Sequence, residues 1–342
     1  MSDYLKNAWY MAAWSADIGS AMLARRLLGQ HLLFFRREDG SIAAMEDRCP
    51  HRFAPLAMGR KQGDRIACRY HGLEFDSHGR CIHNPFSQLI PPGAHIRTFT
   101  VEEQDSIVWL WAGEQSEADP ALIPRFDFLN EPGHKRDTFH IEADYRLIID
   151  NLMDLSHIEF LHTDSFGGGG SILNGTLAVR EQDRQVGALW TMDGIMPPPW
   201  ATSLVAEGER VDHWLDMRWS APAALEVEVG LARQGQPRTP GIIPPLMGVH
   251  VLTPETATAS HYFYSTAPGA QPPVDPDAPP AVNALEDEDK PMLEAIQQRM
   301  GDAEFWSLKP AILSVDAASV RVRRKLAKMI LDERKEKATA TA

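Results

Sequence analysis

The chain has 342 residues, 44% of them hydrophobic and 24% charged, which is an ordinary composition for a globular protein and a length that suits two domains. Its formal net charge of −13 argues against nucleic acid as the main partner, although a pocket with its own Arg or His could still hold a small anion. The N-terminal segment lacks the pattern of a signal peptide, no stretch approaches ~18 consecutive apolar residues, and three cysteines are too few for a disulfide framework. We therefore expect a cytoplasmic protein without a membrane partner.

The first third of the chain is rich in short apolar or alternating runs between Gly, Asp and Pro residues, the pattern of short β-strands. These expected strands occupy residues 30–36, 41–46, 65–70, 73–75, 98–102 and 106–111. The sequence Asp-Ser-His-Gly at 76–79 predicts a hairpin turn. The polar segment 112–124 has helix-breaking ends, so we place a domain boundary after residue 118. Residues 1–118 are thus expected to form a small all-β domain.

The second expected domain, residues 119–342, mixes strands with helices. Strand-like runs occur at residues 140–145, 187–192, 213–219, 225–231, 247–252 and 261–266. Helical character is expected at residues 146–160, 291–300 and 314–333, with a frayed tail at 334–342. The tetraglycine 167–170 and the proline-rich segment 268–280 predict loops. This order suggests an antiparallel sheet around helices, and hence an α+β fold.

Two mixed pairs of cysteine and histidine form the strongest signal in the sequence. Cys49 and His51 form a C-x-H pair, and after sixteen residues Cys68 and His71 form a C-x-x-H pair. Two thiolates suit one iron of a [2Fe–2S] cluster, whereas two imidazoles suit the other iron and raise the cluster potential. A structural zinc ion is the alternative, although zinc fingers normally pair Cys with Cys and His with His. Cys81 lies outside the pattern, and we expect it to be a small buried hydrophobic residue.

Residues 150–162 carry a second set of candidate ligands. Asn151, Asp154 and His157 recur every three residues, along one side of a predicted helix. On an ideal helix His157 and His162 would point about 140° apart, which is too wide for one shared metal. The helix must therefore end or bulge between them if both bind a metal. The alternative is a polar surface helix with two unrelated histidines.

These motifs resemble the Rieske non-haem iron oxygenases, and among them the oxygenase components of the vanillate O-demethylase, dicamba demethylase and toluenesulfonate methyl-monooxygenase group. The resemblance extends from Asn-Ala-Trp-Tyr at 7–10 through C-P-H-R at 49–52 and D-N-L-M-D-L at 150–155 to the last acidic helix. It implies an N-terminal Rieske [2Fe–2S] domain and a C-terminal helix-grip catalytic domain with a mononuclear iron.

The resemblance also implies roles for single residues. The cluster ligands would be Cys49, His51, Cys68 and His71. The mononuclear iron would be held by His157, His162 and a carboxylate near the C-terminus, for which we choose Asp289 within the acidic stretch 286–289. A solvated acidic helix start is the alternative for that stretch.

Three further residues receive roles. By the same resemblance, Asp154 would bridge His71 of one chain and His157 of the next in a homotrimer, and thereby give electrons a short path. Asn151 would lie near the iron. His250 is a candidate for substrate binding by residue type, with an ordinary sheet histidine as the alternative.

The implied reaction is hydroxylation of a methyl group on a small aromatic substrate by O₂. The expected case is O-demethylation of a methoxybenzoate such as vanillate, with release of formaldehyde, and an NAD(P)H-dependent flavin or ferredoxin reductase as the electron donor. A ring-hydroxylating dioxygenase or another alkyl or N-methyl hydroxylase is the alternative among enzymes. A Rieske electron-transfer or redox-sensing protein is the alternative outside them.

Overall fold

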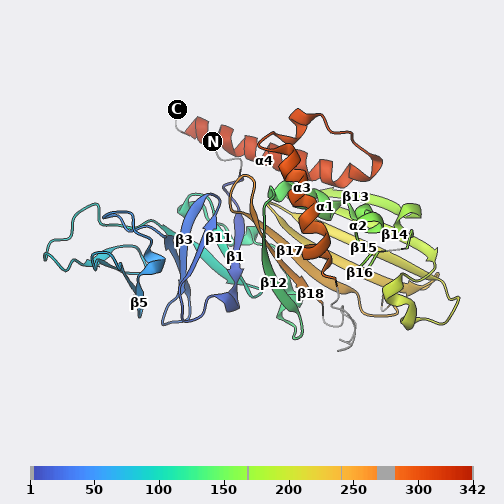
Figure 1. Ribbon diagram of the computed structural model, residues 1–342, viewed down its shortest axis with the longest axis horizontal. Coiled ribbons are helices and arrows are strands. Elements are labelled where there is room, and N and C mark those ends of the chain that lie inside the picture. Colours follow the sequence, from blue (N-terminus) through green and yellow to red (C-terminus); the bar gives the residue numbers. More distant parts are fainter. Residues whose placement is uncertain (1–3, 168, 240, 268–281, 341–342) are drawn as a thin grey trace. The chain divides into compact units, whose positions relative to one another are not determined.

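A computed structural model describes residues 4–167, 169–239, 241–267 and 282–340 (Figure 1). The chain forms two compact units. The first comprises Met1–Asn130, Thr253–Thr256 and Glu333–Ala342, and the second comprises Glu131–Leu252 and Ala257–Asp332. Residues 119–130 thus lie with the first unit, where the buried carboxylate of Asp105 accepts hydrogen bonds from Phe126 N and Asn130 Nδ2.

The first unit is built from three antiparallel sheets, with strand orders β1-β11-β10, β2-β3-β4-β9 and β5-β6-β7-β8. Its strands are β1 (Trp9–Trp14), β2 (Leu23–Leu27), β3 (Gln30–Arg36), β4 (Ile42–Glu46), β5 (Arg60–Gln62), β6 (Arg65–Ala67), β7 (Glu74–Phe75), β8 (Cys81–His83), β9 (Thr98–Phe99), β10 (Val101–Gln104) and β11 (Ile107–Trp111). The hairpin predicted at 76–79 is confirmed, because Gly79 N bonds to Asp76 O between β7 and β8.

Alternation along β3 divides the interior of the first unit into two hydrophobic cores. Leu32 and Phe34 point into one core, whereas Leu33 and Phe35 point into the other. The second core also contains the buried Cys49 and Cys68. The two cysteine loops therefore pack against this second core.

The second unit contains a seven-stranded sheet with the order β12-β18-β17-β16-β15-β14-β13. Strand β12 pairs antiparallel with β18, and β13 to β17 pair antiparallel in sequence order. The strands are β12 (Lys135–Ile141), β13 (Thr176–Gln182), β14 (Gln185–Ile195), β15 (Val211–Ser220), β16 (Ala224–Arg233), β17 (Leu246–Pro254) and β18 (Ser260–Thr266). The predicted proline-rich loop 268–280 lies outside the described residues.

The helices are α1 (Tyr145–Met153), α2 (Ile158–Leu161), α3 (Lys290–Met300) and α4 (Ala317–Ala340). Helix α1 packs on β15 and α3 packs on α1, so that α1, α2 and α3 lie against one face of the sheet (Figure 1). The predicted α+β class, with an antiparallel sheet and helices in the C-terminal part, is confirmed. Among the described residues, no helix combines the length and hydropathy that crossing a membrane requires.

Helix α1 forms because its sequence is amphipathic and capped. Asp144 accepts a hydrogen bond from Arg146 N at its start, and six of its nine residues are buried. Each large apolar side chain buried in this way contributes about 1.5–3 kcal/mol. The prediction that residues 334–342 form a frayed tail is wrong up to Ala340, because α4 extends to that residue. The Glu333 carboxylate in α4 accepts the N–H groups of Lys6 and Asn7, which ties this part of the helix down.

Candidate active site

The two cysteine loops of the first unit share one backbone pattern. In each, the residue four positions after the cysteine donates its N–H to the cysteine carbonyl at 2.9 Å, from Phe53 to Cys49 and from Gly72 to Cys68. Each cysteine N–H donates in turn to the carbonyl five positions onward, at 2.9 Å and 2.8 Å respectively. Phe53 and Gly72 both take a left-handed backbone, with φ of 59° and 72°. Glycine adopts this left-handed conformation without a steric penalty, whereas for Phe53 it is unfavourable by roughly 1–2 kcal/mol.

The four side chains of these loops suit a [2Fe–2S] cluster. Cys49 and Cys68 are buried, and burial, together with the neighbouring Cys68 thiol, raises the pKa of the Cys49 thiol to about 11. The rings of His51 and His71 lie with centroids 4.5 Å apart. Nδ1 of His71 is buried and has no hydrogen-bond partner among the described residues. Such a nitrogen costs free energy unless a metal accepts its lone pair.

A single zinc ion fits the same residues less well. Four tetrahedral ligands of zinc lie within about 4 Å of one another. In the part of the chain that the structure describes, the one group of three or more His, Cys, Asp or Glu residues whose donor atoms all lie within 4.8 Å is His157, His162 and Asp289. The Cys49 thiol neighbours the Cys68 thiol, and the His51 ring neighbours the His71 ring, so the donors pair by type, as a cluster with two thiolates on one iron and two imidazoles on the other requires.

The helix with the candidate iron ligands is interrupted, as the spacing of its histidines predicted. After α1, a 3₁₀ turn, Leu155–His157, leads into the short helix α2, and His162 follows the end of α2. Asp154 caps the new turn, since its carboxylate accepts hydrogen bonds from Ser156 N at 3.1 Å and Ser156 Oγ at 2.7 Å. The chain thus breaks first at Asp154, before both histidines. Helix α2 then ends at Leu161, between the two histidines, as their spacing required, and Nε2 of His157 lies 3.2 Å from Nε2 of His162.

The third candidate ligand comes from the other end of the second unit. Asp289 ends a π-helical segment, Ala284–Asp289, that continues directly into α3. Pro291 lies in the first turn of α3, as expected, because its missing N–H is tolerated there. The helical path nevertheless begins earlier than predicted, and π-helical winding is common at functional sites. Asp289 itself is only 3% exposed, so the alternative of a solvated acidic helix start is wrong for this residue.

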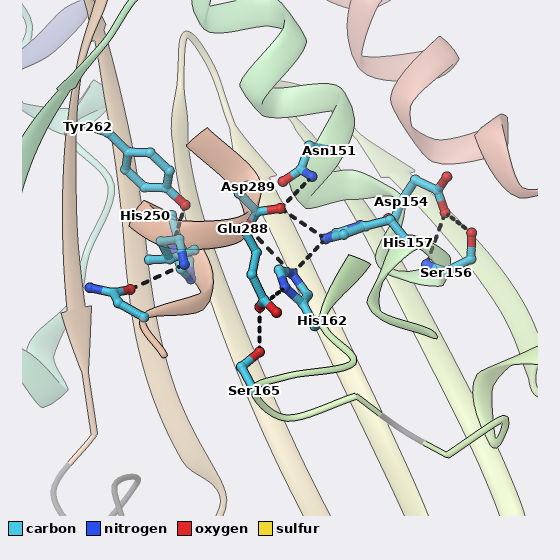
Figure 2. Close-up of polar contacts among 12 residues, drawn as sticks. Asn151, Asp154, Ser156, His157, His162, Ser165, His250, Tyr262, Glu288 and Asp289 are labelled. Atoms are coloured by element: carbon cyan, nitrogen blue, oxygen red, sulfur yellow. Dashed lines mark hydrogen bonds and ion pairs between the residues drawn. The ribbon is translucent and has the colours of Figure 1, made fainter. Parts of the chain in front are cut away.

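These three side chains converge on one point (Figure 2). Nε2 of His157 lies 3.5 Å from Asp289 Oδ1, and Nε2 of His162 lies 3.5 Å from Asp289 Oδ2. Two ligands that are each about 2.1 Å from a shared ion and at right angles are separated by about 3 Å, close to these distances. Two imidazoles and one carboxylate on one face of an ion are the donor set that suits Fe(II) in oxygenases. The residues present therefore fit a mononuclear iron.

Burial and charge give the two histidines different pKa values. Burial lowers the pKa of His157 more than the Asp289 charge raises it. At His162 burial also lowers the pKa, but Asp289 and Glu288 together outweigh it, and the net shift is upward. Asn151 Nδ2 donates to Asp289 Oδ1 at 3.0 Å, which places this amide beside the candidate ligands, and its predicted role near the iron stays a prediction.

Asp154 contacts His157 through its backbone. Nδ1 of His157 lies 2.5 Å from the carbonyl oxygen of Asp154, which makes Nδ1 the protonated nitrogen and leaves Nε2 free as a ligand. The Asp154 carboxylate bonds to Ser156 within the chain. Its predicted role between His71 of one chain and His157 of the next stays a prediction.

His250 on β17 is paired with a residue that sequence analysis missed. Its Nδ1 lies 2.8 Å from the hydroxyl of Tyr262 on β18. Burial lowers the pKa of His250 to about 4 and raises the pKa of Tyr262 well above its usual value, so both side chains are neutral at neutral pH. The charge of Asp289 acts on both groups, and Figure 2 shows them beside Asp289.

Comparison with known proteins identifies the class of the chain. Residues 8–103 match the family described as "Rieske [2Fe-2S] domain", and residues 141–332 match "Vanillate O-demethylase oxygenase C-terminal domain". The chain is thus a metalloenzyme that joins a Rieske cluster domain to an oxygenase catalytic domain.

Individual relatives agree with these matches. The chain is 37% identical to the oxygenase component of chloroacetanilide N-alkylformylase from Rhizorhabdus wittichii, over 99% of both chains. It is 36% identical to the oxygenase component of dicamba O-demethylase from Stenotrophomonas maltophilia, over 95% of this chain and 98% of the relative. The crystal structure of dicamba monooxygenase bound to dicamba superposes with a TM-score of 0.85 at 33% identity, over 97% of this chain and 99% of that chain.

The chain belongs to the Rieske non-haem iron oxygenases, as an oxygenase component of the demethylase and N-dealkylase type. Its cofactors are a [2Fe–2S] Rieske cluster and a mononuclear non-haem iron.

Proposed function

We propose that this enzyme oxidatively removes an alkyl group from a small aromatic substrate, with O-demethylation of a methoxybenzoate such as vanillate as the first candidate. One observation carries the proposal. His157, His162 and Asp289 bring three protein donors to one point, within 4.8 Å of one another, in a chain that also has a cluster domain. Three protein ligands leave coordination positions open for O₂ and substrate.

The reaction balances as follows. An aryl methyl ether, O₂, two electrons and two protons give the hemiacetal and water, and the hemiacetal collapses to a phenol and formaldehyde. When bound, the iron supplies O₂ activation and the cluster supplies electrons one at a time. The side chains of His157, His162 and Asp289 hold the iron, while Asn151 restrains the Asp289 carboxylate through its hydrogen bond to Oδ1.

His250 and Tyr262 would orient the substrate. A buried phenol O–H must donate to an acceptor, and Nδ1 of His250 is its partner at 2.8 Å. The proton of the neutral imidazole then resides on Nε2, which becomes a hydrogen-bond donor. A donor in this position suits a carboxylate or carbonyl oxygen of an aromatic substrate held beside the iron.

N-dealkylation of an anilide is the second candidate. Because the pKa of His250 is about 4, its imidazole is a neutral hydrogen-bond donor at neutral pH. A neutral donor suits an amide carbonyl, whereas a carboxylate would bind more strongly to a charged donor. The relative that is 37% identical is named for an N-dealkylated chloroacetanilide. Both candidates use the same centre and differ in the bond that is cleaved after hydroxylation.

We further propose that the enzyme acts as a homotrimer with an NAD(P)H-dependent reductase or ferredoxin in the cytoplasm. Large apolar side chains surround the cluster loops, with Phe53 67%, Tyr70 61% and Phe86 75% exposed. The His71 ring lies 4.0 Å from the Tyr70 ring and 6.5 Å from the Phe86 ring, between centroids. An exposed patch of this kind is typical of an interface, and an adjoining subunit would bring its own Asp154 to His71. Sedimentation of the loaded enzyme as a monomer at micromolar concentration would contradict the trimer.

Single-turnover chemistry tests the reaction without knowledge of the reductase. The iron-loaded protein is reduced with dithionite, freed of reductant and mixed with O₂ and vanillate, 2-methoxybenzoate or an N-alkyl chloroacetanilide. Formaldehyde and a phenol from a methoxybenzoate support O-demethylation, whereas an aldehyde and the N-dealkylated anilide support the second candidate. A cis-diol would indicate a dioxygenase instead. Full reoxidation of the cluster without any oxygenated product from this panel would oppose both candidates.

A further inference from the structure

His162 is held at both nitrogens of its ring by consecutive acidic residues. Its Nδ1 lies 2.8 Å from Glu288 Oε2, while its Nε2 lies 3.5 Å from Asp289 Oδ2 (Figure 2). Neighbouring side chains on a helix point in different directions, about 100° apart in an α-helix. The π-helical segment Ala284–Asp289 can therefore present one carboxylate to each side of the same imidazole.

The side chain of Glu288 is nearly buried, with 9% of its surface exposed. Its Oε2 accepts a hydrogen bond from Ser165 Oγ at 2.6 Å as well as from His162. Its Oε1 is buried and has no hydrogen-bond partner among the described residues. Nδ1 of His162 points away from the centre formed by the three candidate ligands, so Glu288 contacts the ligand and not the iron position.

The fold alone gains little from such a carboxylate. Burial of an ionised group costs several kcal/mol, and two hydrogen bonds to one oxygen leave the other oxygen unsatisfied. The Asp289 carboxylate beside it is 4% exposed and adds a second negative charge. A divalent cation bound between His157, His162 and Asp289 would neutralise both charges. A bound cation is therefore a partner that this arrangement of charges suits.

We propose that Glu288 is a positioning residue of the iron site. By accepting the Nδ1 proton of His162 it fixes the tautomer and the orientation of that ring, so that Nε2 is directed at the iron. Its negative charge also makes the imidazole a stronger electron donor to the metal. This inference rests on the proposed iron ligands and assigns to Glu288 part of the iron affinity and part of the electronic character of the site.

Three variants test this role. Glu288→Gln keeps the shape of the side chain but removes its charge. Glu288→Met cannot accept the Nδ1 proton and leaves His162 without its partner, so Glu288→Gln, whose amide oxygen can still accept that proton, keeps the test decisive if Glu288→Met fails to fold. Glu286→Gln is the matched control: it lies on the same π-helical segment, and Glu286 bonds to Asn283 Nδ2 at 3.0 Å.

The first readout is the Kd for Fe(II), measured anaerobically by competition with a coloured chelator, with far-UV circular dichroism as the check on folding. Loss of a hydrogen-bond partner of a metal-bound histidine weakens metal binding by about 10–100-fold. We expect this increase in Kd for both Glu288 variants and none for Glu286→Gln. The second readout is the EPR spectrum of the ferrous protein treated with nitric oxide, which should change in both Glu288 variants and stay the same in the control.

The outcomes separate this inference from the proposed function. A wild-type chain that binds Fe(II) beside its cluster, with either Glu288 variant unchanged in both Kd and EPR spectrum, overturns the role of Glu288 and leaves the iron site standing. A wild-type chain that binds no iron beyond its cluster overturns the proposed function, and the inference with it.

Discussion

Replacement of Arg323 by Met should destabilise the second unit, and the loss should grow with pH. Arg323 of α4 is only 8% exposed, and its Nε and Nη2 both lie 2.6 Å from Asp150 Oδ2 in α1. The pair joins the C-terminal helix to the helix that leads to Asn151 and Asp154. Removal of one partner from a buried ion pair costs about 3–5 kcal/mol, because the other charge stays buried without compensation.

The pH dependence follows from the Asp150 carboxyl group. Burial raises its pKa from 3.8 to about 6, although Arg323 opposes the rise. A carboxyl group whose pKa is higher in the folded state costs nothing below pH 3.8, and its cost grows until the pH passes the folded pKa. At about 1.4 kcal/mol per pKa unit, the wild-type cost is about 3 kcal/mol at pH 7. Without Arg323 the folded pKa rises further, so the variant keeps losing stability above pH 6.

Thermal unfolding of the second unit, followed by tryptophan fluorescence at pH 5.5 and pH 8, measures this effect against wild type at each pH. The expected loss corresponds to a midpoint lower by about 10 °C at pH 8, and to a smaller shift at pH 5.5. The double variant Asp150→Asn/Arg323→Met removes both charges and should recover part of the loss at pH 8. Equal shifts at the two pH values, or a double variant no better than Arg323→Met, would refute the reasoning.

Two further predictions follow from the site and the cluster loops. His250→Phe should raise KM for a methoxybenzoate about two- to tenfold with iron content unchanged, since the loss of one hydrogen bond costs about 0.5–1.5 kcal/mol. Tyr262→Phe should have a smaller effect in the same direction. An unchanged KM in steady-state kinetics would remove His250 from the pocket. Gly72→Ala should lower the temperature at which the cluster absorbance is lost, because the φ of 72° at this position is unfavourable for alanine. Phe53→Gly should raise that temperature, because it relieves the same backbone strain in the other loop. Shifts of the same sign in both variants would contradict the equivalence of the two loops.

Local sequence patterns were sufficient for the parts of this structure that local physics determines. The spacing of Cys49, His51, Cys68 and His71 predicted the two loops, and the five-residue interval from His157 to His162 required the broken helix that the structure contains. The strand predicted at 30–36 coincides with β3, because its apolar residues lie between clear turn signals. The prediction placed a strand at 140–145, whereas the observed strand β12 is Lys135–Ile141. The first residues of β12 are polar, so no pattern in the sequence indicates that they pair with β18.

Contacts between distant segments could not be predicted in this way. His162 and Glu288 lie 126 residues apart, and the sequence around neither residue predicts their hydrogen bond. Tyr262 is one aromatic residue among several on β18, and its role depends on His250 in the adjacent strand. Strand β1 was missed because all six of its residues are buried, which gives an apolar run without the alternation of a half-exposed strand. Cys81, expected to be buried, is half-buried at the edge of the core.

Iron and acid-labile sulfide per chain, measured on protein purified without oxygen and supplied with Fe(II), test the two-centre account most directly. The account predicts about three iron atoms and two sulfides for wild type, and about two iron atoms and two sulfides for Asp289→Ala, since the cluster ligands lie elsewhere. Two iron atoms in wild type, unchanged by added Fe(II), would leave only an electron-transfer protein, and zinc without sulfide would contradict both centres.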